Sequence, residues 1–349
     1  MRNGTDVRNA SACYRWLRWM AVPVALCGLS ANATQYVVPG GAGDKSGGSW
    51  ANAREDVQAA VNAATLPGEE VWVAAGRYEV AAPVALRSGS VVLGGFAGTE
   101  NAASQRNWDA NVTILDGLDA TRVVSMEDIV SGRLDGLVVT RGYVSVTNGM
   151  GGGGILIQGS EGCEVANCKI LHNRSVRATG ATACEGGGIY LNYGTNCVIA
   201  NCLFTENTSV SYGTSLSIRN STGVTVSTCR FVGCFMDGTL GVVRVQSNIS
   251  GIQFSNCLAS GNKAYYGSFI YAAQDMSAIN CTVCCTTNSS GVPFIINPQT
   301  WSGTASSPST HRLAYGKSQA PAPVIPMSRT IFFMARLWRI ITIMISPCT

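Results

Sequence analysis

Five segments of eleven residues align without gaps, and they constrain the fold more than any other feature of the sequence. The segments span residues 163–173, 197–207, 224–234, 252–262 and 276–286, and their central cysteines are Cys168, Cys202, Cys229, Cys257 and Cys281. The intervals between these cysteines are 34, 27, 28 and 24 residues. Self-similarity at such a period is typical of solenoids, in which each repeat contacts only its neighbours.

The apolar positions within each segment indicate two short strands that meet at a bend. Counted from the central cysteine, apolar residues stand at −5 and −3, and again at 0 and +2. Each pair alternates with the two-residue period of a strand, but the step from −3 to 0 breaks that alternation. The four positions do not share one face of an α-helix. The pattern therefore predicts coils in which both strands turn these positions inward.

Asparagines form two further columns. At position −1, next to the bend, the column contains Asn167, Asn201, Asn256 and Asn280, with Thr228 in the third segment. At position +5 it contains Asn173, Asn207 and Asn262. Stacked amides can hydrogen-bond from coil to coil, and Asn tolerates the left-handed backbone of a sharp corner. We expect both columns to be structural ladders.

The cysteines at positions −5 and 0 are expected to be buried, free thiols that stack as small hydrophobic side chains. Stacked neighbours would have nearly parallel Cα–Cβ vectors, which suits a disulfide poorly. Four cysteines outside these columns could still pair locally: Cys184, Cys234, Cys284 and Cys285.

Earlier residues keep the strand rhythm without cysteine, in short apolar runs closed by glycine-containing turns, such as 70–78, 90–96, 112–117 and 134–142. Residues 34–300 are therefore predicted to be an all-β, right-handed parallel β-helix, with the Cys/Asn repeats at 163–286. Before the coils, residues 49–64 carry the pattern of an amphipathic helix that Ser49 can cap and whose face includes Trp50 and Val57. This helix is expected to close the N-terminal end of the solenoid, which would otherwise expose unpaired strand edges.

The two ends of the chain differ from the body. Residues 1–33 combine four arginines with a short apolar run and small residues, which is typical of an export signal. Residues 301–349 carry five basic and no acidic residues, and we expect a frame-shifted or unstructured tail there. A membrane anchor in this tail would place arginines in lipid. Residues 34–300 carry a net charge of −4 and no basic stripe, so nucleic-acid binding is not expected.

Several motifs resemble a known family. They are Tyr-Val-Val-Pro-Gly at 36–40, Ser-Trp-Ala-Asn-Ala at 49–53, the strand at 70–78, Gly-Gly-Phe-Ala-Gly-Thr-Glu at 94–100 and Gln-Arg-Asn-Trp at 105–108. Together they resemble the start of bacterial right-handed β-helix proteins of the pectin-lyase-like fold. Gly-Gly-Ile-Tyr at 187–190 followed by Phe-Thr-Glu-Asn at 204–207 is similar to the repeats of polymorphic outer membrane proteins. The resemblance implies a bacterial protein that is secreted or located at the cell surface or outer membrane.

The resemblance implies either an enzyme acting on acidic polysaccharides or a non-catalytic surface protein. An enzyme would need clustered acids or a base beside carboxylates that hold calcium. The acids of the later coils instead occur singly, at Asp135, Glu161, Glu164, Glu185, Glu206, Asp237 and Asp275. Lys169 and Lys263 stand at different offsets from their central cysteines. No catalytic residue is therefore assigned, and calcium is expected only if the protein is a lyase.

Other polar residues are interpreted as surface features. Asp135 precedes a glycine and is expected in a turn, and His172 is expected to be exposed. Arg141, Arg219 and Arg244 are interpreted as solvated side chains that could bind carboxylated glycans. The tyrosines of the coils could present flat contacts to sugars or proteins: Tyr190, Tyr193, Tyr212, Tyr265, Tyr266 and Tyr271.

The sequence thus favours a secreted or surface-exposed, adhesin-like β-helix protein that binds a polysaccharide or a surface protein. An extracellular polysaccharide lyase or glycoside hydrolase is the alternative. The glycine runs 151–154 and 186–188 lack the residues that complete a phosphate loop, so no nucleotide, cofactor or metal site is expected. Membrane association is expected only through the signal or the tail.

Overall fold

The computed structural model describes residues 34–147, 150–180, 183–234, 241–264, 269–272, 276–284, 287–288, 294–296, 329–333 and 341–346. These residues belong to the unit that begins at Asn32. The expected export signal at 1–33 and the expected surface residues Tyr265 and Tyr266 lie outside them.

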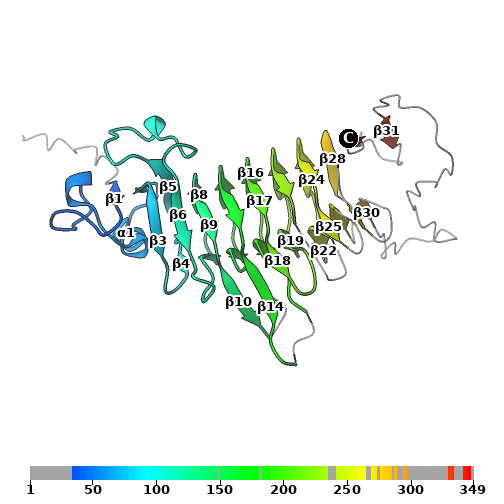
Figure 1. Ribbon diagram of the computed structural model, residues 1–349, viewed down its shortest axis with the longest axis horizontal. Helices are drawn as coiled ribbons and strands as arrows, with labels where there is room; N and C mark the ends of the chain where they lie inside the picture. The colour runs from blue at the N-terminus through cyan, green and yellow to red at the C-terminus, as the bar shows by residue number, and fades with distance from the viewer. Residues whose placement is uncertain are drawn as a thin grey trace, which may run out of the picture. The chain divides into compact units, whose positions relative to one another are not determined.

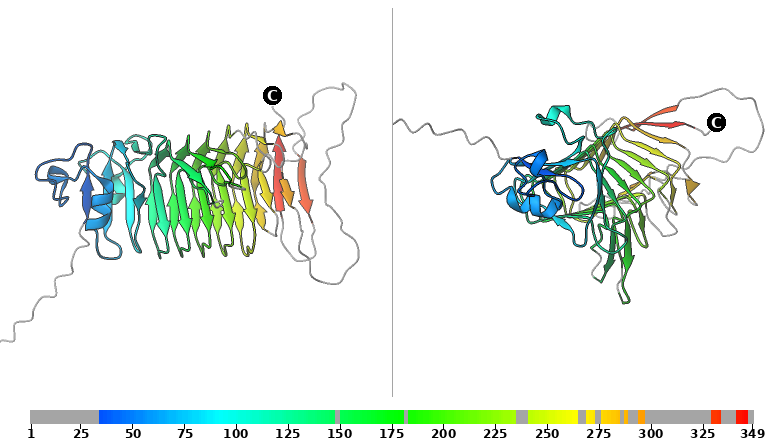
Figure 2. Two further views of the ribbon diagram at one scale, coloured as in Figure 1. Left: turned by 90° about the horizontal axis from the view of Figure 1, so that it is seen from below. Right: turned by 60° about the vertical axis from the view of Figure 1, so that its left-hand side comes forward.

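Most of the described strands form three parallel sheets, one strand from each sheet per coil, and successive coils lie side by side (Figures 1 and 2). The first sheet contains β1 (Gln35–Val37), β2 (Glu70–Ala74), β5 (Val91–Phe96), β8 (Arg133–Asp135), β12 (Glu164–Ala166), β16 (Val198–Ala200), β20 (Thr225–Ser227), β23 (Gln253–Ser255) and β27 (Ser277–Ile279). The second contains β3 (Gly76–Glu79), β6 (Thr113–Asp116), β9 (Val138–Thr140), β13 (Lys169–Leu171), β17 (Leu203–Thr205), β21 (Arg230–Val232), β24 (Leu258–Ser260), β28 (Cys281–Cys284), β32 (Ile341–Ser346) and β31 (Arg329–Phe333).

The third sheet contains β4 (Val84–Ala85), β7 (Val124–Glu127), β11 (Ile155–Gln158), β15 (Ile189–Asn192), β19 (Leu216–Arg219), β22 (Val243–Gln246), β26 (Ile270–Ala272) and β30 (Phe294–Ile296). Two smaller sheets stand between the second and third: β10 (Tyr143–Val146), β14 (Arg174–Arg177) and β18 (Thr208–Ser209), and then β25 (Lys263–Ala264) and β29 (Thr287–Asn288). The described helices are η1 (Trp50–Asn52), α1 (Val57–Ala63) and η2 (Ala103–Gln105).

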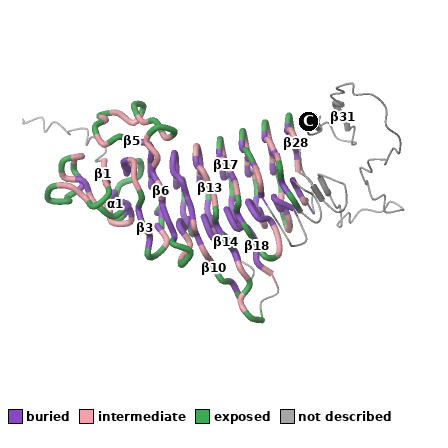
Figure 3. The backbone as a smooth tube through the Cα atoms, in the orientation of Figure 1, coloured by how far each residue is buried: buried purple, intermediate pink, exposed green. Residues whose placement is uncertain are grey.

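The strand registers follow the columns of the repeat. In the first sheet, Val165 pairs with Ile199 and Ile199 pairs with Val226, and all three side chains are buried. In the second sheet, Ile170 and Phe204 pair in the same way and are fully buried. The interior of the coils is therefore a continuous apolar core. Figure 3 shows buried residues recurring in the strands of successive coils. The predicted all-β parallel fold is confirmed.

The corner between the first and second sheets is made by one residue in the left-handed conformation. Its φ is 52° at Asn167, 51° at Asn201, 54° at Thr228, 53° at Asn256 and 51° at Asn280. A left-handed residue turns the chain sharply, so the strands on both sides of it can direct apolar residues inward. Asparagine reaches this conformation more readily than other non-glycine residues, which accounts for its recurrence at the corner.

The predicted helix at 49–64 is too long. The structure contains the short 3₁₀-helix η1, then an extended break, and the α-helix only from Val57 to Ala63. Asp56 caps that helix, because its Oδ1 accepts the amide of Ala59 at 2.5 Å, whereas Ser49 makes no capping hydrogen bond. The Trp50 side chain packs with an aromatic group outside the coil interior instead of continuing the helical face. Helix α1 contacts β1, β2 and β4 at the N-terminal end.

The tail prediction is also wrong in part. Residues 329–333 and 341–346 form β31 and β32, an antiparallel pair, and β32 extends the second sheet by pairing with β28. A strand pairs through its backbone, so it can satisfy an open sheet edge whatever its side chains are. The other residues of 301–349 lie outside the described part of the chain.

Candidate functional site

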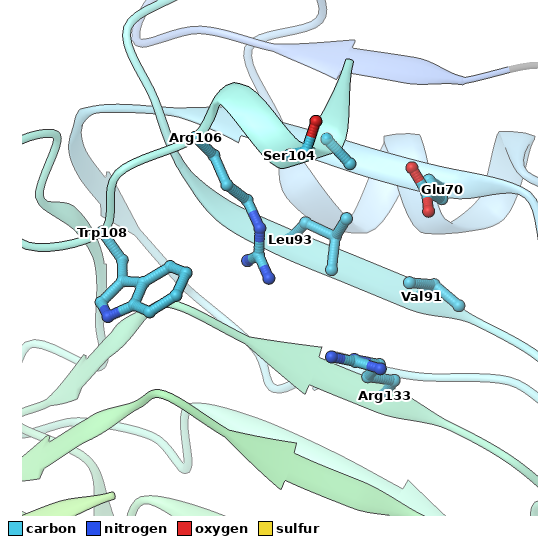
Figure 4. Close-up of a pocket in the computed structure, with 8 residues that line it drawn as sticks. Glu70, Val91, Leu93, Ser104, Arg106, Trp108 and Arg133 are labelled. Carbon is cyan, nitrogen blue, oxygen red and sulfur yellow. The ribbon is translucent and has the colours of Figure 1, made fainter. Parts of the chain in front are cut away.

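A hollow on the described surface lies over the first sheet near the N-terminal end. It has a volume of about 450 Å³. Residues of strands β2, β5 and β8 form its floor, and residues between 103 and 108 form its wall (Figure 4). The lining residues are Glu70, Val91, Leu93, Ala103, Ser104, Arg106, Trp108 and Arg133. We call this hollow the Trp108 pocket.

Backbone contacts hold the wall of the Trp108 pocket in place. Gly95 has a φ of 93°, and a Cβ there would lie 2.8 Å from the backbone of Trp108, so only glycine allows this approach. The carbonyl of Gly95 accepts the amide of Asn107 at 2.7 Å. The Glu100 carboxylate accepts the amides of the three residues before it, and its carbonyl accepts the indole N–H of Trp50 at 2.8 Å. The indole of Trp108 thus stands on a fixed loop.

A fully buried carboxylate anchors the charged side of the pocket. Asp135 binds Arg106 Nη2 through Oδ1 at 2.9 Å and Arg133 Nη2 through Oδ2 at 2.5 Å. Its Oδ1 also accepts the side-chain amide of Asn167 at 2.8 Å. The hydrogen bond to Asp135 raises the pKa of Arg133. Asp135 is therefore a structural ion-pair partner, and its expected turn position is wrong because it ends strand β8.

The charges around the pocket nearly cancel. Arg133 also pairs with Glu164 at 3.2 Å, so two carboxylates balance the two guanidinium groups. The fifth charged side chain, Glu70, accepts the indole N–H of Trp72 at 2.5 Å. These five groups leave one negative charge in excess. The pocket therefore has no positive surplus that would attract an anionic sugar.

A second, smaller hollow of about 210 Å³ shares Trp108 with the pocket. It follows the corner between the first and second sheets and is lined by Trp108, Asp109, Asn167, Cys168, Lys169, Asn201, Cys202, Leu203, Thr228 and Arg230. Lys169 pairs with Asp109 at 3.1 Å, which ties the wall of the pocket to strand β13. Trp108 thus stands between two hollows.

The corner asparagines form hydrogen-bonded rows on the surface. The Nδ2 of Asn201 donates to Oδ1 of Asn167 at 2.7 Å, and the Nδ2 of Asn280 donates to Asn256 at 2.6 Å. Thr228 stands between Asn201 and Asn256. At the other end, Nδ2 of Asn167 donates to the carboxylate of Asp135, so the corner row begins at Asp135.

The asparagines at position +5 lie inside the coils. Asn173, Asn207 and Asn262 are fully buried, and each Nδ2 donates to a carbonyl of the preceding coil at 2.7–3.0 Å. Sequence reasoning missed a third row, at the end of the third sheet. There Asn220 donates to Asn192 at 2.9 Å, and Asn248 donates to Asn220 at 3.2 Å. The equal 28-residue spacing of these three asparagines was the available signal.

The five central cysteines are free and at most 2% exposed. Cys163 and Cys197, at position −5, are also free and buried. Cys184 and Cys234 are free and buried and Cys284 is free and half-buried, whereas Cys285 lies outside the described residues. Burial raises the pKa of Cys234 to about 11.

Several side chains expected at the surface are buried under turns. Arg244 is 7% exposed and pairs with the buried Glu185 at 2.8 Å, and Arg219 binds the same carboxylate oxygen at 3.1 Å. The guanidinium of Arg244 also lies 3.7 Å from the ring centre of Tyr212. Tyr190 is 2% exposed. Tyr190 and Arg244 point outward from the third sheet, but glycine-containing turns pack directly over them, so their expected exposure is wrong. The Arg219 side chain is 30% exposed and is only partly covered.

The remaining candidates do not converge. Asp116, fully buried, pairs with Arg141 at 2.8 Å, and His172 pairs with Glu206 at 3.2 Å among exposed side chains. Asp237 and Asp275 lie outside the described residues. Across the described part of the chain, no three His, Cys, Asp or Glu residues gather as metal ligands. No helix among the described residues is long and apolar enough to cross a membrane.

Comparison with known proteins supports the architecture. Residues 129–294 match the family model for a right handed beta helix region. The fold is a right-handed parallel β-helix. A comparison with curated protein sequences gave no significant match.

Solved structures with similar coils differ widely in function. PfbA, a surface adhesin of Streptococcus pneumoniae, shares 12% identity at a TM-score of 0.28, covering 67% of this chain and 76% of PfbA. The endo-xylogalacturonan hydrolase from Aspergillus tubingensis shares 9% at 0.29, covering 73% and 84%. ORF18 of Geobacillus virus E2 shares 12% at 0.25, covering 67% and 58%. At such TM-scores these likenesses carry no argument about function, and a relation to polymorphic outer membrane proteins is not among them.

Proposed function

We propose that the protein is an exported, adhesin-like β-helix protein that binds an uncharged glycan at the Trp108 pocket without cleaving it. The observation that carries the proposal is the pocket itself, in which a half-buried indole stands beside fixed polar side chains over an apolar floor. Sugars combine apolar C–H faces with hydroxyl groups, so an aromatic plane and a few oriented polar groups recognise them.

The charge balance selects among glycans. Arg106 and Arg133 both point into the pocket (Figure 4), but Asp135 and Glu164 already neutralise them. A carboxylated sugar would gain little long-range attraction and would meet the excess negative charge at Glu70. Neutral hydroxyls, in contrast, can accept from the guanidinium groups and donate to Glu70.

The acids of the pocket favour binding over hydrolysis. A glycosidase needs two carboxyl groups that face the scissile bond from opposite sides. Asp135 is fully buried and uses both oxygens on Arg106, Arg133 and Asn167. Glu70 then remains as the lining acid without an ion pair in the described contacts. Export to the cell exterior is part of the proposal and rests on the signal-like segment at residues 1–33.

The test is binding of the full chain to an array of neutral and acidic glycans, followed by affinity measurement for each hit. Trp108→Ala should weaken binding to a neutral glycan by up to about tenfold, because a contact with an aromatic ring contributes on the order of 0.5–1.5 kcal/mol beyond the area that it buries. Tyr193→Ala removes a 58% exposed aromatic ring at the third sheet and should leave the affinity unchanged. Binding restricted to acidic glycans, or equal losses in both variants, would refute the proposed site. Release of reducing or unsaturated ends by the wild-type chain would refute a purely binding role.

A further inference from the structure

The five central cysteines form a continuous file of thiols through the interior. Each one follows a left-handed corner residue and occupies the same position of its coil. The carbonyl of Cys168 accepts the amide of Leu203 at 2.9 Å, and the carbonyl of Cys202 accepts that of Arg230 at 2.8 Å. In the same way, the carbonyl of Cys229 accepts the amide of Leu258, and the carbonyl of Cys257 accepts that of Thr282. The backbone thus sets one repeat distance for the whole file.

The thiols of the file are neighbours from coil to coil. Because they occupy the same position of adjacent, hydrogen-bonded coils, Cys202 lies between Cys168 and Cys229, and Cys257 lies between Cys229 and Cys281. A second, separate pair is formed by Cys163 and Cys197 at position −5. Sulfur–carbonyl distances of 3.3–3.7 Å show that backbone oxygens are the other neighbours of the file. These weak contacts can be exchanged for stronger ones.

The geometry matches one kind of ligand. Neighbouring strands stand about 4.8 Å apart, and parallel Cα–Cβ vectors do not favour a disulfide. A two-coordinate ion held in a line between two sulfur atoms has bonds shorter than the roughly 2.3 Å of four-coordinate zinc–sulfur bonds, so it spans slightly less than about 4.6 Å. We infer that the file binds soft monovalent metal ions of the Cu(I) type, each one held linearly between the thiols of two adjacent coils.

Two ligands are sufficient for such an ion, so the absence of larger ligand clusters among the described residues does not conflict with the site. Thiolate sulfur is the ligand type that selects Cu(I) over harder cations. Each ion forms two metal–sulfur bonds and displaces one thiol proton to solvent, while the second thiol keeps its proton and donates a lone pair. No electron is transferred, and the buried site stays neutral, which avoids the cost of an isolated buried charge.

The file has a definite capacity. A sulfur atom that served two collinear bridges would need its two metal bonds in a straight line, which a thiolate does not adopt, so each thiol takes part in one bridge. Five thiols in a row then hold two ions. The pair Cys163 and Cys197 holds a third. Because the thiols are used in pairs, the number of ions lost on removing one cysteine depends on its position in the file.

The experiment titrates the reduced full chain with Cu(I) without oxygen, in competition with a chromophoric Cu(I) chelator, and counts the ions bound per chain. Cys202→Ala leaves the adjacent thiols Cys229, Cys257 and Cys281, which hold one ion, so the count should fall by one. Cys229→Ala removes an equally buried thiol but leaves two intact pairs, so the count should equal that of the wild type. Cys184→Ala removes a buried thiol whose described contacts are serine oxygens and should also leave the count unchanged.

Equal losses in Cys202→Ala and Cys229→Ala, or a loss in Cys184→Ala, would overturn the pairwise bridges. The exposed thiols of the wild-type chain can also be blocked before the titration. If the blocked chain then binds no Cu(I), the buried site is refuted. X-ray absorption of the loaded wild-type chain provides a test that does not depend on any variant folding. Two sulfur neighbours at a distance below about 2.3 Å are expected, since two-coordinate bonds are shorter than those of four-coordinate zinc, and a shell of three sulfurs would refute linear coordination.

Discussion

Replacing Asp135 by Asn tests whether one buried carboxylate holds the Trp108 pocket and the corner row together. The substitution keeps the shape of the side chain but removes its charge and one acceptor oxygen. Arg106, whose side chain is 11% exposed, then loses its buried partner, and breaking such a pair costs about 3 kcal/mol or more. Arg133 is 40% exposed and can turn to solvent, so its share is below about 1 kcal/mol.

The hydrogen bond from Asn167 survives the substitution, because the amide oxygen of Asn can take the position of Oδ1 and still accept from Nδ2 of Asn167. We therefore expect Asp135→Asn to lower the free energy of unfolding by about 3–4 kcal/mol, summed from the shares of the two arginines. Contributions within one network are not additive, so the test depends on which variant loses more stability and not on the exact sum.

Urea unfolding of the wild-type and variant chains, followed by circular dichroism with the slope m compared between them, measures the change. Asp109→Asn is the matched control, because it breaks the pair with Lys169 in which the two side chains are 75% and 36% exposed. The control should lose less than about 1 kcal/mol. A loss below about 1 kcal/mol for Asp135→Asn, or equal losses in both variants, would refute the role assigned to the buried carboxylate.

Two further predictions concern single coils. Thr228 has a φ of 54°, which is unfavourable for a β-branched residue, so Thr228→Asn should raise the free energy of unfolding by about 1 kcal/mol. Thr225→Asn is the control, because Thr225 lies in the extended strand β20, and it should not raise the free energy of unfolding. A gain in the control would contradict the argument from the corner conformation. Burial raises the pKa of Cys234 from 9.0 to about 11, so between these pH values the unfolded chain loses the thiol proton while the folded chain keeps it. Stability should therefore fall as pH rises from 9 to 11, by up to about 3 kcal/mol from this thiol. Unfolding of Cys234→Ala followed over that range should lack this part of the decline, and parallel pH profiles for the two chains would show the reasoning to be wrong.

The core of the coils could be predicted from the sequence because the strand period and the corner are both local. Inward positions such as Val165 and Ile170 recur at fixed offsets from a central cysteine, and a one-residue shift of register would expose them. The α-helix boundary was less accessible. Both Ser49 and Asp56 are good N-caps, and the tertiary packing of Trp50 decided between them.

The covered face of the third sheet could not be predicted in the same way. Alternation correctly places Tyr190 and Arg244 on the outer side of their strands. Whether that side meets water depends on turns of other coils, and these vary in length. Gly213, for instance, packs within contact distance of Arg244, and a side chain in its place would meet that residue at 3.2 Å. The Trp108 pocket was missed for the same reason, since its wall and its floor come from different coils.

The direction of the amide rows explains why an acid stands at the start of the corner row. In both surface rows every described amide donates toward the N-terminal coil. An amide at the first position would carry N–H groups that themselves need an acceptor. In the third-sheet row that first residue is Gln158, which is half-buried and can reach water. In the corner row it is Asp135, which is fully buried; a carboxylate ends the row because it only accepts, and the two arginines that neutralise it are those that shape the Trp108 pocket.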